Sequence, residues 1–375
     1  MTESDYYEKV RLKLNIGPFF APKHKLVFEI MKILWNEEEV KILSQFNSVN
    51  KSISLKKLSE KLGIPKNEIK KKLARSVKNG TISKIGNTYA LIPLAPGVFE
   101  KYYINRKDSI ENQIKIANLF QEYITEIFSL QLLESNPKMF RPVLPYKAKE
   151  KLIKIDELID VPKSQILPYE SVEFLINKND IFATLPCQCR TIGEYSGNPC
   201  ELASYEFGCL YGGVAAQRLI YYGAARQITK EEAIEHIKKA EKMGLIHTTV
   251  ADNSLASSMF ICNCCTCHCF LLQHTKKYRI KTVTPSNFMP EINKELCIKC
   301  ETCIKKCQMD AIFHQLPNEP DLSDEYIFIK EEYCIGCGVC ASNCPKNAIK
   351  MVKIREDDFS KKIKFENRLL PELFI

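Results

Sequence analysis

A length of 375 residues is long for a single hydrophobic core, so we expect the chain to fold as two or three domains. Hydrophobic residues make up 45% of it, which is typical of a globular protein, and no apolar run approaches the length of a membrane-spanning helix. The formal net charge of +9 is spread along the sequence, which is compatible with an acidic partner protein or with nucleic acid and selects neither.

The N-terminal residues and the cysteine content indicate a compartment. The sequence MTESDYYEKVRLKLNIG is charged and lacks the apolar stretch of a secretory signal, so we expect a cytoplasmic protein. In that compartment the seventeen cysteines are expected to be reduced thiols or metal ligands rather than disulfides.

Residues 26–92 have the pattern of a winged helix-turn-helix, in which amphipathic helices are followed by a two-stranded hairpin. Gly63-Ile64-Pro65 separates two of the helices, and Gly86-Asn87 is a two-residue hairpin turn. The predicted elements are helices at 26–35, 37–46, 54–62 and 66–79 and strands at 81–85 and 88–92.

The helix predicted at 66–79 is strongly basic. In a DNA-binding protein its cations would face phosphates and the major groove. It lacks an obvious set of side chains aimed at base edges, however, and lysine-rich helical faces are usually only solvated. Because winged helices also dock proteins or dimerise, DNA is kept as the less favoured partner. The basic residues are Lys66, Lys70, Lys71, Lys72, Arg75 and Lys78.

Residues 98–180 carry no recognisable chemistry and are predicted to connect the domains. A helix with a broad apolar face is predicted at 110–133, and we expect it to pack on the winged helix or on a second copy of the chain. The segment 137–168 is punctuated by prolines and is predicted to be extended, and another helix begins near Glu170.

A group of cysteines in the middle of the chain is denser than packing requires. Ordinary scaffold lies within it: a helix at 214–222, a helix from the capping box at Thr229 to Gly244, and a strand at 245–250. No P-loop or dinucleotide fingerprint is present. The group comprises Cys187, Cys189, Cys200, Cys209, Cys262, Cys264, Cys265, Cys267 and Cys269, with His268.

The run at 262–269 is predicted to serve two metal sites. If the run is extended, Cys262 and Cys264 point to one side, and Cys265, Cys267 and Cys269 point to the other. Cys187 and Cys189 would supply a same-side pair, and Cys200 and Cys209 could complete either site. An additional [4Fe-4S] cluster is our first interpretation because the cysteines offer only thiolates. Tetrahedral zinc is the alternative, in which His268 is either a ligand or a bystander.

Two cysteine runs near the C-terminus repeat one another. Laying LCIKCETCIKKCQMDAI over YCIGCGVCASNCPKNAI aligns all eight cysteines and the Ala-Ile pair after each run. In this spacing three cysteines bind one cubane cluster and the fourth reaches the partner cluster, whereas zinc sites usually use separated cysteine pairs. The spacing therefore assigns Cys297, Cys300, Cys303 and Cys344 to cluster 1 and Cys334, Cys337, Cys340 and Cys307 to cluster 2.

These runs resemble those of the two-cluster, 2[4Fe-4S], bacterial-type ferredoxin domain. The resemblance implies a pseudo-two-fold β-α-β fold with both clusters in its core. One departure is Gln308, which stands where the second run has Pro345, and the loop there is expected to be less rigid.

The wider order LPCQCR, GLIHTT, ICNCC and then the two runs resembles a family of cysteine-rich four-iron ferredoxin-type proteins of anaerobic microbes. The resemblance extends over about 90–350 and implies an iron–sulfur electron carrier. In that family the run after ICNCC is richer in cysteine, so His268 is a departure.

Together these features predict an α+β multidomain fold and a protein or subunit that passes single electrons through two [4Fe-4S] clusters, with a further cluster in the middle domain, to a partner redox enzyme. An oxidised cubane with four thiolates carries about −2, so two clusters lower the net charge to about +5. The alternatives are a reductase with a catalytic metal site in the middle domain, near His247 and His268, and a redox-sensing winged-helix regulator. The predicted parts are a winged-helix-like domain at 1–97, a helical connecting region at 98–180, a cysteine-rich metal or cluster domain at 181–289, a dicluster ferredoxin domain at 290–352 and a C-terminal tail at 353–375.

Overall fold

The computed structural model divides the chain into two compact units, each of which is considered by itself. Unit 1 comprises Met1–Ser135, Pro186–Pro199 and Phe365–Ile375, and unit 2 comprises Asn136–Leu185 and Cys200–Lys364. Both the connecting region and the middle domain predicted from the sequence are therefore shared between the units. The residues described are 3–15, 20–49, 51–128, 130–131, 138, 140–146, 170–250, 258–316 and 325–355.

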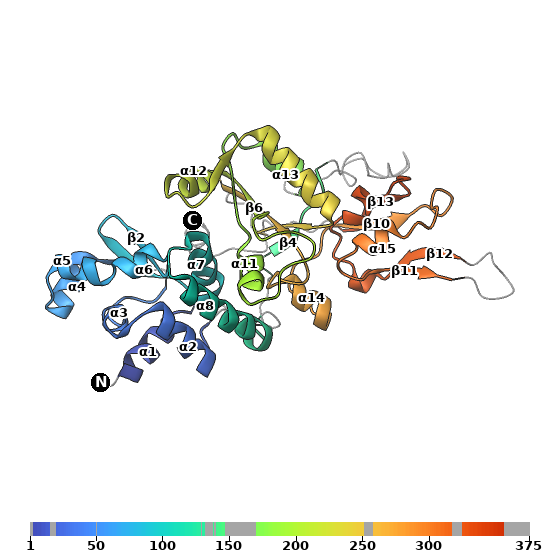
Figure 1. Ribbon diagram of the computed structural model, residues 1–375. Helices are drawn as coiled ribbons and strands as arrows, with labels where there is room; N and C mark the ends of the chain where they lie inside the picture. The colour runs from blue at the N-terminus through green and yellow to red at the C-terminus, as the bar shows by residue number, and fades with distance from the viewer. Residues whose placement is uncertain are drawn as a thin grey trace. The chain divides into compact units, whose positions relative to one another are not determined.

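Unit 1 is largely helical, with one small antiparallel sheet of order β1-β3-β2 (Figure 1). Its helices are α1 (Glu3–Arg11), α2 (Lys25–Leu34), α3 (Glu37–Leu43), α4 (Leu55–Leu62), α5 (Lys66–Lys72), α6 (Ala74–Lys78), α7 (Phe99–Asn105), α8 (Ile110–Tyr123) and α11 (Gln188–Tyr195), and its strands are β1 (Ile53–Ser54), β2 (Ile82–Ile85) and β3 (Thr88–Leu91). The predicted hairpin is confirmed, because Ile85 pairs with Thr88 across Gly86-Asn87. The helix predicted from Ile110 is present as α8, which packs on α2 and α11 and continues as the π-helical segment Ile124–Phe128; positions 129, 132 and 133 of its predicted end lie outside the described residues.

The helix predicted at 66–79 is broken, which corrects the sequence-based expectation. Leu73 has φ −88° and ψ 0°, and it separates α5 from α6. Beyond the break, Arg75 and Ser76 both donate to the carboxylate of Glu39, at 2.7 and 2.8 Å. Glu39 is only 1% exposed, and a buried carboxylate needs such partners. A contact distant in sequence therefore outweighs local helix propensity here.

Unit 2 contains a six-stranded antiparallel sheet of order β4-β8-β9-β6-β5-β7. The strands are β4 (Phe140–Pro142), β5 (Phe182–Leu185), β6 (Cys209–Gly213), β7 (Arg226–Ile228), β8 (Ile246–Val250) and β9 (Ser258–Cys264), and the helices around them are α10 (Val172–Asn177), α12 (Val214–Tyr221), α13 (Lys230–Met243) and α14 (Leu272–Tyr278). The expected capping box is confirmed: Thr229 accepts the N–H of Glu232, and the Glu232 carboxylate accepts the N–H of Thr229. Gly244 ends α13 at φ 88°, as expected.

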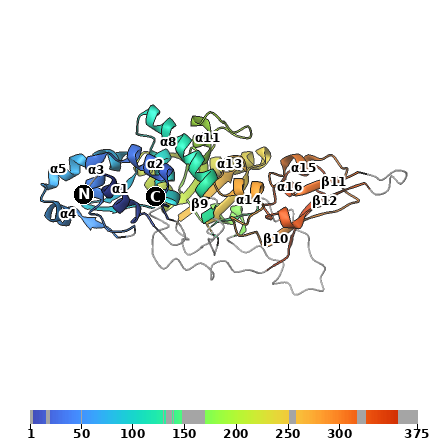
Figure 2. The same cartoon turned by 90° about the horizontal axis from the view of Figure 1, so that it is seen from below.

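The C-terminal part of unit 2 consists of two β-α-β halves. They are β10 (Phe288–Ile292), α15 (Thr302–Lys306) and β11 (Ile312–Gln315), then β12 (Tyr326–Ile329), α16 (Val339–Ser342) and β13 (Ile349–Lys353). The first strand of each half pairs with the last strand of the other, β10 with β13 and β12 with β11. α15 packs against β11 and α16 against β13, and the two helices contact one another (Figure 2). This pseudo-symmetric arrangement is the ferredoxin-type fold expected from the repeat.

The backbone of the two halves repeats along with the sequence. Three aligned pairs have positive φ in both halves: Lys299 with Gly336, Glu301 with Gly338, and Asp310 with Asn347. The loops around the cysteines therefore turn in the same way, even where the first half has side chains and the second has glycine.

Candidate metal centres

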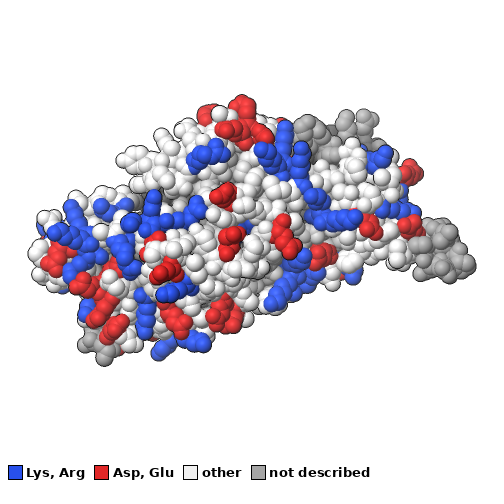
Figure 3. Space-filling view, in the orientation of Figure 1, with Lys and Arg blue, Asp and Glu red and all other residues white. Residues whose placement is uncertain are grey.

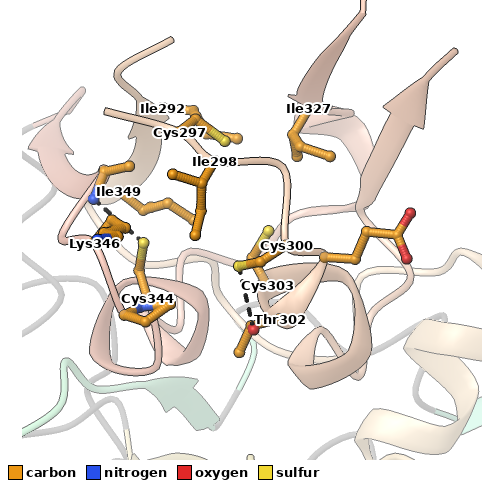
Figure 4. A pocket seen from close by; sticks show the side chains of 13 residues that line it. Ile292, Cys297, Ile298, Cys300, Thr302, Cys303, Ile327, Cys344, Lys346 and Ile349 are labelled. Atoms are coloured by element: carbon orange, nitrogen blue, oxygen red, sulfur yellow. Dashed lines mark hydrogen bonds between the residues drawn. The ribbon is translucent and has the colours of Figure 1, made fainter. Parts of the chain in front are cut away.

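One cysteine of the second run lies with three cysteines of the first. Figure 4 shows the four sulfur atoms directed towards a common pocket. The pocket has a volume of about 350 Å³ including its opening to solvent, and isoleucine side chains form much of its wall. Burial raises the pKa of the Cys303 thiol to about 11, and charges on Cys297 and Cys344 add to this effect. The cysteines that line the pocket are Cys297, Cys300, Cys303 and Cys344.

The reciprocal arrangement is found around Cys307. Burial raises the pKa of the Cys334 thiol to about 11, and repulsion from the Cys307 thiolate contributes. Burial also raises the pKa of Cys337 and of Cys340, with repulsion from Cys307 and Cys334 contributing to both. Thiols crowded in this way become thiolates readily only when a cation compensates their charge. Each of the two sets assigned from the spacing is therefore brought together.

Backbone amides donate to the sulfur of the last cysteine in each run. The N–H of Ala311 lies 3.4 Å from Cys307 Sγ, and the N–H of Ala348 lies 3.2 Å from Cys344 Sγ. Ala311 and Ala348 are the alanines of the repeated Ala-Ile pair. Such N–H···S bonds stabilise negative charge on the ligands and are one means by which proteins set cluster potentials.

The loop of the second run is closely packed. Gly336 has φ +69°, and a Cβ atom there would lie 2.1 Å from the carbonyl oxygen of Phe288. Only glycine can occupy this position without a shift of the backbone. The equivalent Lys299 also has positive φ but carries its side chain to the surface, where it pairs with Glu325 at 2.9 Å.

The middle run is not extended throughout. β9 ends at Cys264, and residues 265–269 form a turn in which the N–H of Cys269 donates to the carbonyl of Cys265. The alternation expected for an extended run therefore fails after Cys264. The reason is local: once the chain leaves β9 and turns, side chains no longer alternate between two faces.

Four residues of the middle region form a compact group that we call the Cys3His group. Its four ligand atoms all lie within 4.8 Å of one another. Cys200 Sγ is 3.5 Å from Cys267 Sγ, and His268 Nδ1 is 3.1 Å from the same sulfur. Hydrogen bonds with Cys265 and Cys267 lower the pKa of the Cys200 thiol, whereas hydrogen bonds with Cys200 and Cys265 raise the pKa of Cys267. The members are Cys200, Cys265, Cys267 and His268.

The remaining cysteines of unit 2 form an all-sulfur group. Cys209 Sγ lies 3.5 Å from Cys262 Sγ. The Cys264 thiol is within hydrogen-bonding reach of both Cys262 and Cys269. Thr248 Oγ1 lies 3.3 Å from Cys264 Sγ. The turn after β9 thus places Cys269 with this group rather than with Cys265. The all-sulfur group comprises Cys209, Cys262, Cys264 and Cys269.

Cys187 and Cys189 belong to unit 1. Cys187 immediately precedes α11, and its carbonyl accepts both the N–H and the hydroxyl of Thr191, at 2.8 and 2.9 Å. These bonds fix the first turn of α11 around the two cysteines. Their expected role as a ligand pair stays a prediction.

Gln308, the departure from the repeat, joins the dicluster segment to the middle region. Its side-chain oxygen accepts the N–H of Thr266 at 2.8 Å, and its side-chain nitrogen donates to the carbonyl of Gly244. The Thr266 hydroxyl donates to the Gln308 carbonyl at 3.2 Å. Proline could not make the side-chain bonds. The substitution therefore connects the residue after Cys307 to the turn that holds the Cys3His group, a role that the sequence did not indicate.

The two histidines considered for acid catalysis both have partners. His247 is 1% exposed, and its Nδ1 donates to Asn263 Oδ1 at 2.8 Å. Glu241 lies 3.5 Å from Nε2 of the same ring. His268 belongs to the Cys3His group. Both rings are buried, His247 at 1% and His268 at 5% exposure.

The basic helix of unit 1 is partly neutralised within the unit. Lys72 lies 2.9 Å from Glu38 and 3.5 Å from Glu68, and Arg75 is bound to Glu39. Figure 3 shows acidic side chains interspersed with basic ones over these N-terminal helices. A surface of mixed sign attracts the DNA backbone less than a continuous basic face would.

Comparisons with known proteins identify one part of the chain. Residues 290–351 match the family model of a 4Fe-4S dicluster domain. No curated protein and no solved structure matched the chain. Within the described part of the chain, no helix combines the length and the apolar character needed to cross a membrane. The match covers both cysteine runs, so this segment is an iron–sulfur domain.

Proposed function

We propose that this protein is an iron–sulfur electron carrier, or the electron-transfer subunit of an oxidoreductase, and that it passes single electrons through two [4Fe-4S] clusters to a partner redox enzyme. The observation that carries the proposal is that Cys344 of the second run lines one pocket with the first three cysteines of the first run. On this proposal the fourth cysteines are exchanged between the clusters, and α15 and α16, the short helices that lead to Cys307 and Cys344, join the two ligand sets.

The donor chemistry fits this cofactor. Each set offers four sulfurs and no other ligand atom, and buried isoleucines such as Ile312 and Ile349 surround them. When bound, the clusters supply a one-electron couple. The chain holds them in a largely apolar environment, limits access of water, and stabilises their charge through the Ala311 and Ala348 amides.

We extend the proposal to a third cluster at the all-sulfur group. The support is its donor set: four cysteines, from β6, from β9 and from the turn that follows. Binding of a cubane would draw apart the sulfurs of Cys209 and Cys262, which lie 3.5 Å from one another. A cluster there would lengthen the route for electrons beyond the dicluster domain.

We also propose that α2–α6 and the β2–β3 hairpin form a winged helix that docks a partner protein. The ion pairs of Lys72 and Arg75 support this choice over DNA. Binding of duplex DNA with a steep dependence on salt and a sequence preference would instead favour the alternative of a redox-sensing winged-helix regulator. Membership in the wider family of ferredoxin-type proteins of anaerobic microbes belongs to the same proposal.

The crossed ligand sets can be tested with paired serine variants of anaerobically purified protein. Cys344→Ser and Cys297→Ser should leave the same residual EPR spectrum, because both damage cluster 1. Cys307→Ser and Cys334→Ser should share a different one. Ser342→Ala, in the helix before Cys344, is the matched control and should keep both clusters.

The opposite pairing would overturn the assignment. If Cys344→Ser gave the spectrum of Cys334→Ser, each run would bind its own cluster. If the wild-type protein were folded but free of iron, the whole electron-transfer proposal would fail.

A further inference from the structure

We infer that the Cys3His group binds one zinc ion, which fastens the turn after β9 beside the dicluster domain. The inference concerns a site outside both ferredoxin ligand sets. It does not depend on the proposed electron-transfer function.

The spacing of the ligand atoms suits one ion. A tetrahedral zinc ion with bonds of about 2.3 Å to sulfur and about 2.0 Å to nitrogen keeps its ligand atoms roughly 3.5 to 3.8 Å apart. In the Cys3His group all four lie within 4.8 Å, and the Sγ atoms of Cys200 and Cys267 are 3.5 Å apart. Each ligand of a cubane, by contrast, binds a different iron at a different corner. Its four sulfurs must therefore lie farther apart than those around one ion.

The ferredoxin sets provide an internal comparison. Among the residues that the structure describes, the Cys3His group alone brings three or more metal-ligating side chains together within that distance. Neither set assigned to a cubane does so, although every one of those cysteines is described. The chain thus contains two kinds of thiol cluster, an open kind in the dicluster segment and a compact kind here.

The donor types also favour zinc. Three thiolates and one imidazole form one of the common structural zinc sets, and four protein ligands leave no open position for substrate. Zinc has no redox chemistry. The group would therefore not take part in electron transfer, and its contribution would be mechanical.

The position of the group shows what an ion there would hold. Cys200 lies in the loop before β6, whereas the other three ligands lie in the turn after β9, so a bound ion would cross-link two distant segments. Cys265 packs with Ala240 and Leu245 in a small apolar cluster, and Thr266 between two ligands bonds to Gln308. Zinc would thereby hold in place the turn to which Gln308, the residue after Cys307, is hydrogen-bonded.

Metal analysis of the full-length protein tests the inference. We expect about one zinc per chain in addition to iron. His268→Ala and Cys267→Ser should each lose that zinc and keep the wild-type iron content. His236→Gln, a half-buried histidine of the same unit outside the group, is the control and should keep both metals.

A second measurement does not depend on how the variants fold. Wild-type protein expressed with Co²⁺ in place of Zn²⁺ should show the intense ligand-field and thiolate charge-transfer bands of tetrahedral cobalt. It should also protect the Thr266 amide from hydrogen exchange as the zinc form does. Bands of an octahedral cobalt site in the wild-type protein would overturn the assignment.

The metal counts separate this inference from the proposed function. Loss of iron in His268→Ala, with no zinc in the wild type, would mean that the group binds an iron–sulfur cluster or a single iron ion, and would overturn the inference. Zinc at full occupancy in a chain that contained no iron would support it while refuting electron transfer.

Discussion

Replacement of Gln308 by alanine should loosen the contact between the dicluster segment and the turn after β9. Two side-chain groups would lose their partners: the oxygen accepts from the Thr266 N–H, and the nitrogen donates to the carbonyl of Gly244, with a weaker branch of 3.4 Å to that of Cys264. At about 1 kcal/mol each, with about 1 kcal/mol more for the buried Thr266 N–H left without an acceptor, the cost is about 3 kcal/mol. Thr266 is only 7% exposed, so water does not readily replace the missing acceptor.

Hydrogen exchange at the Thr266 amide measures this effect directly. A loss of about 3 kcal/mol corresponds to roughly a hundredfold faster exchange through local opening. Gln315→Ala is the matched control, since within the described part of the chain that side chain bonds to the carbonyl of the next residue, Leu316. An exchange rate within about threefold of the wild type in Gln308→Ala would refute the reasoning.

Gln308→Pro sharpens the test. It restores the residue found at the equivalent position of the second run, Pro345. If Gln308 served only to shape the turn, proline would stabilise the loop. On our account Gln308→Pro loses the same bonds as alanine, and the Thr266 amide exchanges as fast in both variants.

Three further predictions concern other parts of the chain. Burial raises the pKa of Glu100 to about 7, so the free energy of unfolding should fall as the pH rises from about 4.5 to 7. Glu100→Gln should remove this dependence and add up to about 3 kcal/mol of stability above pH 7. Urea unfolding, followed by the fluorescence of the single tryptophan, measures both effects. Gly336→Ala should abolish cluster 2 in EPR because its Cβ would collide with a backbone carbonyl, whereas Lys299→Ala at the equivalent position should keep both clusters. Hydrogen bonding to Glu301 raises the pKa of His314. The pair therefore stabilises the fold fully below the ordinary histidine pKa, and this stabilisation is lost as the pH rises through the raised pKa. Glu301→Gln should lower the pKa of His314 in an NMR titration of the ring.

Features encoded by neighbouring residues were predictable from the sequence. The turn at Gly86-Asn87 and the capping box at Thr229 depend on residues within a few positions of one another, and both are found as expected. The two ferredoxin cysteine sets were also predictable, although they join distant residues, because the repeat fixes the symmetry that brings Cys344 to the first run and Cys307 to the second.

Features that depend on unrelated distant segments were not predictable. The break at Leu73 accompanies the partnership of Arg75 with Glu39 in another helix. The division of the middle cysteines depends on where β9 ends and on the return of Cys200 from a separate loop. Periodicity along the run could not reveal that the chain turns after Cys264, which is why the grouping of Cys269 was missed.

The two halves of the iron–sulfur domain differ in how far their cysteine loops are exposed to solvent. Ile298, beside the first cysteine of the first run, is 58% exposed, whereas its counterpart Ile335 is 5% exposed. Cys300 is exposed, while its counterpart Cys337 is half-buried. A visiting redox protein would approach the first centre most closely, and tunnelling weakens steeply with distance. Electrons would therefore enter or leave through the first centre, and the second centre would pass them on towards the sheet of the same unit.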